Sequence, residues 1–63
     1  MNLFIKMKIL ERGISQFELS RIIGVSDAYL SKVIRGWINP TPEISQRIAE
    51  ALGCQIEEIF PKG

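Results

Sequence analysis

Four glycines divide this 63-residue chain into short segments, and they constrain its fold more than any other feature. Gly13, Gly24, Gly36 and Gly53 each follow a stretch in which apolar residues recur at helical spacing. Glycine often ends a helix because it adopts the left-handed backbone conformation without steric cost. No strand-like alternation of apolar and polar residues persists along the chain. The pattern therefore predicts an all-α fold.

We expect five helices, at residues 3–12, 16–23, 27–35, 42–52 and 55–59. Ser15 and Glu18 have the spacing of a capping box at the start of the second helix, and Ser26 is placed to cap the third. Before the fourth helix, Thr41 is the predicted N-cap and Pro42 takes the first helical position. A chain of this length forms at most one domain, which we expect to cover residues 1–63.

Apolar spacing also indicates which faces are buried. The first helix has one stripe of Leu3, Met7 and Leu10 and another of Ile5 and Ile9, so either stripe could face the core. In the second helix, the fourth helix and the last turn, the residues expected on the core side are Leu19, Ser20, Ile22, Ile23, Ile44, Ile48, Ala51, Leu52, Ile56, Ile59 and Phe60.

The composition argues against an enzyme. There is no histidine, a single cysteine and no glycine-rich phosphate loop, so we expect no catalytic residues, no metal site and no cofactor. No apolar run approaches the roughly 20 residues of a membrane-spanning helix, so we expect no membrane partner. The lone Cys54, expected as a buried thiol, fits a reducing compartment, and we expect a cytoplasmic protein.

The third predicted helix has two chemically distinct faces. At about 100° per residue, one face carries Asp27, Ala28, Ser31, Lys32 and Arg35, and the opposite face carries Leu30, Val33 and Ile34. The second and third helices are joined by the three-residue turn Gly24-Val25-Ser26, which predicts a helix-turn-helix. A small, polar outer face with cations toward one end suits a recognition helix in the major groove of DNA.

The stretch ISQFELSRIIGVSDAYLSKVIRG, followed by a proline and RIAEALG, resembles the Cro/CI-type (phage-repressor-like) helix-turn-helix family. The likeness covers about residues 5–60. It implies a compact five-helix, lambda-repressor-like DNA-binding domain, with the helix-turn-helix at helices 2 and 3. Members of the family are usually dimeric.

The resemblance also implies roles for individual residues. The expected base-contacting residues are Asp27, Ala28, Ser31 and Lys32, and the expected phosphate-contacting residues are Gln16, Ser26, Arg35, Asn39 and Thr41. Three of these have structural alternatives: Asp27 as a partner of the helix dipole, Ser31 in packing and Thr41 as a simple cap. Gln16 could also brace the recognition helix.

The chain departs from the family pattern at several positions. Ile9 and Ile34 stand where many relatives pair an arginine with a glutamate, and an apolar contact there would replace the ion pair. Phe17 and Ile22 stand where relatives usually carry polar residues, and Trp37 lies in a loop, so each is either extra core or part of a partner surface. The predicted dimer or partner surface consists of Trp37, Ile38 and Ile59. Ile59 could equally lie in the core, where Ile56 and Phe60 are expected.

These observations predict a sequence-specific transcriptional regulator, in our interpretation a repressor, that reads a near-palindromic operator in double-stranded DNA as a homodimer. No second domain is visible, so we expect no small-molecule effector. The competing hypothesis is a protein-interaction module, such as an antitoxin-like or anti-repressor subunit. The net charge of only +1 and the extra apolar residues favour that alternative.

Overall fold

The computed structural model describes residues 1–61, and within that range it contains helices and no strands. The elements are α1 (Leu3–Arg12), α2 (Gln16–Ile23), α3 (Asp27–Arg35), α4 (Pro42–Leu52) and α5 (Ile56–Ile59). The predicted all-α fold and its five helices are confirmed, with α5 beginning one residue later than expected. None of the described helices is long and apolar enough to cross a membrane.

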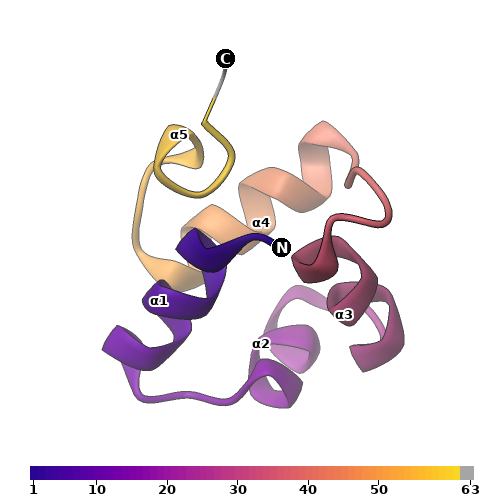
Figure 1. Cartoon of the computed structure of the whole chain (residues 1–63). Helices are drawn as coiled ribbons and strands as arrows, with labels where there is room; N and C mark the ends of the chain where they lie inside the picture. Colours follow the sequence, from indigo (N-terminus) through magenta and orange to yellow (C-terminus); the bar gives the residue numbers. More distant parts are fainter. Residues whose placement is uncertain (62–63) are drawn as a thin grey trace.

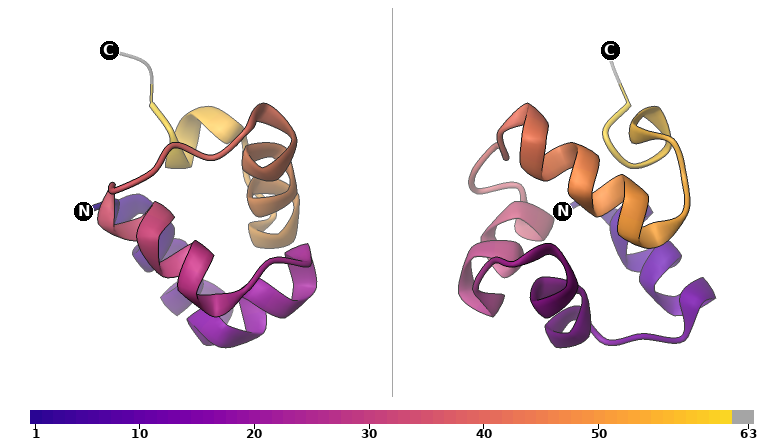
Figure 2. Two further views of the ribbon diagram at one scale, coloured as in Figure 1. Left: turned by 90° about the vertical axis from the view of Figure 1, so that its right-hand side faces the viewer. Right: turned by 180° about the vertical axis from the view of Figure 1, so that it is seen from behind.

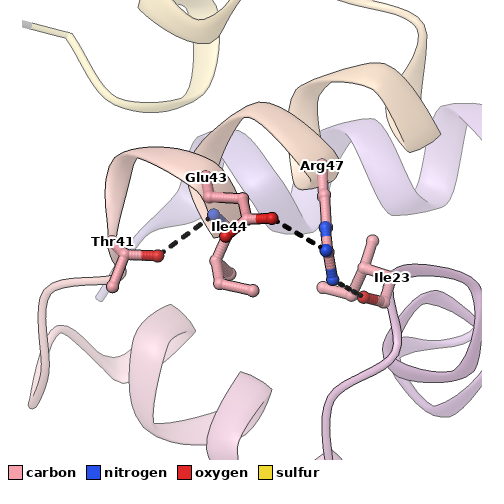
Figure 3. Close-up of polar contacts among 5 residues, drawn as sticks. All are labelled: Ile23, Thr41, Glu43, Ile44 and Arg47. Carbon is pink, nitrogen blue, oxygen red and sulfur yellow. Dashed lines mark hydrogen bonds and ion pairs between the residues drawn. The ribbon is translucent and has the colours of Figure 1, made fainter.

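The predicted start signals form the expected hydrogen bonds. The Ser15 hydroxyl accepts from the backbone N–H of Glu18, whose carboxylate accepts from the N–H of Ser15. Thr41 caps α4 by accepting from the N–H of Ile44 at 3.2 Å, as Figure 3 shows. The four longer helices each end at the predicted glycine in the left-handed conformation. The helix boundaries are therefore encoded locally.

The helices surround one core (Figures 1 and 2). Helix α4 lies behind the others in Figure 1 and packs against α1, α2 and α5, while α3 packs against α2 and α1. The core side chains come from all five helices: Ile5, Ile9, Leu19, Ile23, Leu30, Val33, Ile34, Ile48, Ala49, Leu52 and Ile59. Burial of this apolar surface is the main driving force for folding.

Burial settles the open choice in α1 and corrects some predictions. Helix α1 buries Ile5 and Ile9, so its other apolar stripe faces outward. Ile22 was expected on the core side of α2 but is 62% exposed, because Leu19 and Ile23 already fill the contact with the core. Cys54 is half-buried rather than buried, and desolvation raises the pKa of its thiol.

Asn2 connects the start of the chain to two other elements. Its side-chain oxygen caps α1 by accepting from the N–H of Ile5, and its amide nitrogen donates to the carbonyl of Ile59 at 2.7 Å. The Asn2 N–H also donates to the carbonyl of Ile34, at the end of α3. Asn2 therefore joins α1, α3 and α5.

Candidate nucleic-acid interface

Helices α2 and α3 form a tight helix-turn-helix. Gly24 ends α2 with φ = 79°, a backbone conformation that a side chain would strain. The N–H of Val25 then donates to the carbonyl of Ser20 at 3.0 Å, which closes the turn. Ser26 starts α3 by accepting from the N–H of Tyr29 at 3.0 Å. These local bonds fix the angle at which α3 leaves α2.

Ser20 is a small polar residue of α2 near the turn to α3. Its side chain is buried, and its hydroxyl donates to the carbonyl of Phe17 one turn earlier in α2. The hydroxyl is thus satisfied within its own helix. A small residue leaves room for the turn to fold back at this point.

The two faces of α3 are separated as predicted. Leu30, Val33 and Ile34 are buried in the core. The residues predicted to contact DNA lie on the outer side: Asp27, Ala28, Lys32 and Arg35 are exposed and Ser31 is half-buried. Among the described residues, Lys32 and Arg35 take part in no ion pair. Both cations are therefore available to an anionic partner.

Gln16, at the start of α2, contacts the start of α3. Its amide nitrogen donates to the carboxylate of Asp27 at 3.3 Å. Because an ionised carboxylate only accepts hydrogen bonds, this contact fixes the amide with its nitrogen toward Asp27. One N–H of Gln16 stays free for another acceptor. The expected bracing of the recognition helix by Gln16 is therefore present.

The end of α3 positions Trp37. The N–H of Trp37 donates to the carbonyl of Lys32 at 2.9 Å, just beyond the terminal Gly36. The guanidinium of Arg35 lies 5.1 Å from the centre of the indole ring, a cation–π distance. Trp37 is 67% exposed, so of the two interpretations left open for it, extra core is wrong.

Arg47 is a residue whose role the sequence analysis missed. One of its nitrogens donates to the carbonyl of Ile23 at the end of α2, at 3.3 Å, and another pairs with Glu43 at 2.9 Å (Figure 3). Arg47 therefore ties α4 to the helix-turn-helix. The i, i+4 spacing of Glu43 and Arg47 is enough to predict their ion pair from the sequence. Nothing in the sequence predicts the hydrogen bond from Arg47 to α2.

A family model described as helix-turn-helix matches residues 5–59 of the chain. The protein belongs to the Cro/CI-type helix-turn-helix family. No curated protein matches the sequence significantly. As a member of this family, the protein is a DNA-binding helix-turn-helix regulator with a lambda-repressor-like fold. The paired helices α2 and α3 are the elements that define the family.

The two isoleucines predicted to stand in place of an ion pair are both in the core. Ile9 is 8% exposed and Ile34 is 2% exposed. Burying apolar side chains in place of an ion pair is often neutral or stabilising for a fold.

The predicted dimer or partner surface is only partly exposed. Ile59 is 0% exposed and lies in the core, so its assignment to a surface was wrong. The cause is the short α5, which turns Ile59 inward against α4 and leaves Ile56 and Phe60 partly buried beside it. Ile38 is also partly buried, and Trp37 is the exposed member of the set.

Within residues 1–61, no group of acidic, cysteine or histidine side chains is arranged to hold a metal ion.

The phosphate-contacting candidates at helix starts have a common feature. The hydroxyls of Ser26 and Thr41 accept from their own helices, which leaves their O–H groups free to donate. Asn39 is exposed in the loop between α3 and α4.

Proposed function

We propose that the protein regulates transcription by inserting α3 into the major groove of a specific operator. The observation that carries this proposal is the outer face of α3. It is a small, polar surface held by the helix-turn-helix, and its two cations make no ion pair with any residue that the structure describes. Residues on such a face reach base edges, whereas the opposite face anchors the helix in the core.

The proposed base contacts follow from side-chain chemistry. Lys32 donates to O6 or N7 of guanine, and Ala28 contacts a thymine methyl group. Asp27 accepts from N4 of cytosine through the carboxylate oxygen that Gln16 leaves free. Ser31, which is half-buried, contributes a shorter polar contact beside Lys32.

The proposed phosphate contacts surround this face. Gln16 donates its free N–H, and Ser26 and Thr41 donate their hydroxyls. Arg35 and Asn39 add donors at the end of α3 and in the following loop. Helix N-termini strengthen these contacts, because their backbone N–H groups favour anions. Together they would fix the register of α3 on the duplex.

We also propose that two copies bind one near-palindromic operator and repress by covering it. A single recognition helix makes few contacts, and a second copy about one helical turn away (roughly 34–36 Å) doubles them. Trp37, with the adjacent Ile38, is the proposed contact between the two copies on DNA, because its indole ring is exposed beside α3.

Selection of duplex DNA from a random pool by the purified protein at low salt tests this function. The expected result is an enriched motif with two-fold symmetry and half-sites about one turn apart. Binding to that motif should weaken linearly in the logarithm of the salt concentration. A pool that remains random after repeated rounds would overturn the proposal.

The second candidate function, a module that covers a partner protein, is favoured by exposed apolar side chains. Phe17, Ile22 and Trp37 are each more than half exposed. An apolar interface weakens little with salt, unlike phosphate contacts. The salt dependence of any complex isolated from the host therefore separates the two functions.

A further inference from the structure

The outer face of α1 is apolar and uncovered. Leu3, Phe4, Met7 and Leu10 are 50–79% exposed. Together they expose on the order of 400 Å², about one tenth of the 4214 Å² surface of the molecule. Figure 1 shows α1 at the left side of the molecule, in front of α4. The function proposed above makes no use of this face.

The spacing along this face is that of a helix that pairs with another helix. Leu3, Met7 and Leu10 are separated by four and then three residues, the a/d spacing of a coiled coil. In a parallel pair, a central side chain of one helix inserts between four residues of the other. For Met7 these are Leu3, Lys6, Met7 and Leu10. All four line part of a shallow hollow of about 610 Å³ between α1 and the start of α2, which Ile9, Ile14, Ser15 and Gln16 also line.

The charges beside this stripe are complementary to each other. Lys6 lies on one flank and makes no ion pair among the described residues. The other flank carries Glu11, with Glu57 and Glu58 of α5 close by. Among the described residues its one cation is Lys8, which pairs with Glu11 and Glu58. One edge of the stripe is therefore positive and the other is net negative.

We propose that a second copy of this chain docks on the outer face of α1, with the two α1 helices parallel. A two-fold axis along parallel helices sets each flank against the opposite flank of the partner, so Lys6 of each copy faces Glu11 of the other. Antiparallel helices would set each flank against itself and bring like charges together. The stripe, the hollow and the charges thus select one occupant and one orientation.

The contact is small, so the expected dimer is weak. A standard stable interface buries about 800 Å² on each partner, and the stripe offers about half of that. We therefore expect a dimer that dissociates in the micromolar to millimolar range. The docking is measured without DNA, so its failure and the failure of the proposed function are distinguishable.

Sedimentation equilibrium of the full chain over this concentration range is the test. Lys6→Glu and Glu11→Lys, taken separately, should each weaken the dimer at least threefold, because each places like charges across both contacts. An equimolar mixture of the two variants should dimerise at least as well as the wild type, because both cross-contacts are again attractive. Leu10→Ser should abolish the dimer at all concentrations tested.

A matched control keeps the proposal falsifiable. Ile22→Ser removes an exposed apolar side chain elsewhere and should leave the dimer unchanged. Circular dichroism should show native helix content in every variant, because none of the substituted residues is buried. A wild type that is monomeric at millimolar concentration overturns the proposal. So does a dimer that Ile22→Ser dissociates and Leu10→Ser does not, or a mixture of charge variants that stays monomeric.

Discussion

Gln16 and Asp27 show how single side chains shape the proposed DNA-binding face. The hydrogen bond between them joins the first residues of α2 and α3. It occupies one oxygen of the carboxylate and orients the amide before DNA arrives. The negative charge of Asp27 repels DNA phosphates and so weakens binding. Its hydrogen bond with Gln16 offsets this by fixing the geometry between α2 and α3.

Replacing Gln16 by alanine tests this contact. Gln16→Ala should weaken binding about five- to tenfold for every duplex, since a phosphate contact and a brace are lost but no base contact is. Fluorescence anisotropy with several duplexes measures this. Gln46→Ala, an exposed glutamine of α4, is the matched control and should bind normally. A loss confined to one sequence would contradict the assigned role.

Two contacts of the Glu58 carboxylate make the stability of the fold depend on pH in the acid range. The backbone N–H of Gln55 and the ammonium of Lys8 lower the pKa of the Glu58 carboxyl. A lowered pKa in the folded state stabilises the protein above the ordinary carboxyl pKa, and this stabilisation is lost as the pH falls through the folded value.

The Glu58→Gln variant should therefore be less stable than the wild type at neutral pH, with a difference that shrinks as the pH falls below the ordinary carboxyl range. Urea unfolding from pH 7 to pH 3 measures the difference. Within residues 1–61, Glu57 makes no hydrogen bond or ion pair through its side chain, so Glu57→Gln is the control. A pH-independent difference for Glu58→Gln would contradict the linkage.

At the level of elements, helix ends were predictable from sequence, because capping depends on residues within one turn. The hydroxyls of Ser15, Ser26 and Thr41 accept the expected hydrogen bonds. Burial was harder to predict, because it depends on elements far apart in the sequence. The choice between the two stripes of α1 and the inward turn of Ile59 are set by α4 and α5.

The same distinction applies to the candidate site. The polar face of α3 could be predicted, since helical periodicity alone separates it from Leu30, Val33 and Ile34. The contact of Arg47 with the carbonyl of Ile23 could not, because it joins residues 24 positions apart. The polar surface of the proposed site was therefore predictable from the sequence, whereas the contact of Arg47 that supports it was not.

Removing a cap should cost about 1 kcal/mol. Ser15→Ala eliminates the capping box of α2 and should lower the melting temperature by about 4–8 °C, as expected for a domain of this size. Ser45→Ala in α4, whose side chain makes no hydrogen bond among the described residues, is the control. Differential scanning calorimetry compares the two variants. Equal melting temperatures for both would contradict the importance of the cap.

For the whole molecule, the core and the DNA-binding face are one structure. Three core residues belong to α3 itself, so the recognition helix is held by the same packing that stabilises the fold. A chain of this size has a small core and a small stability margin. DNA binding should therefore depend strongly on residues that never touch DNA.

Ile48 in α4 tests this dependence. Ile48→Ala opens a cavity at a fully buried site and should destabilise the protein by about 2–5 kcal/mol, enough to unfold much of it. Ile22→Ala deletes the same atoms at an exposed site and should cost far less. Chemical denaturation measures both. Similar losses in the two variants would contradict the assigned core.

The most direct test of the central claim, that α3 reads DNA sequence, is the base-pair discrimination of Lys32→Ala on the selected operator. Affinities are measured at fixed salt for the operator and for duplexes with single base-pair changes. We expect the variant to lose discrimination at one base pair in each half-site, worth about 1–3 kcal/mol, and to keep it at the other base pairs. Discrimination that is unchanged at every position would show that Lys32, and with it the assigned face of α3, does not read the sequence.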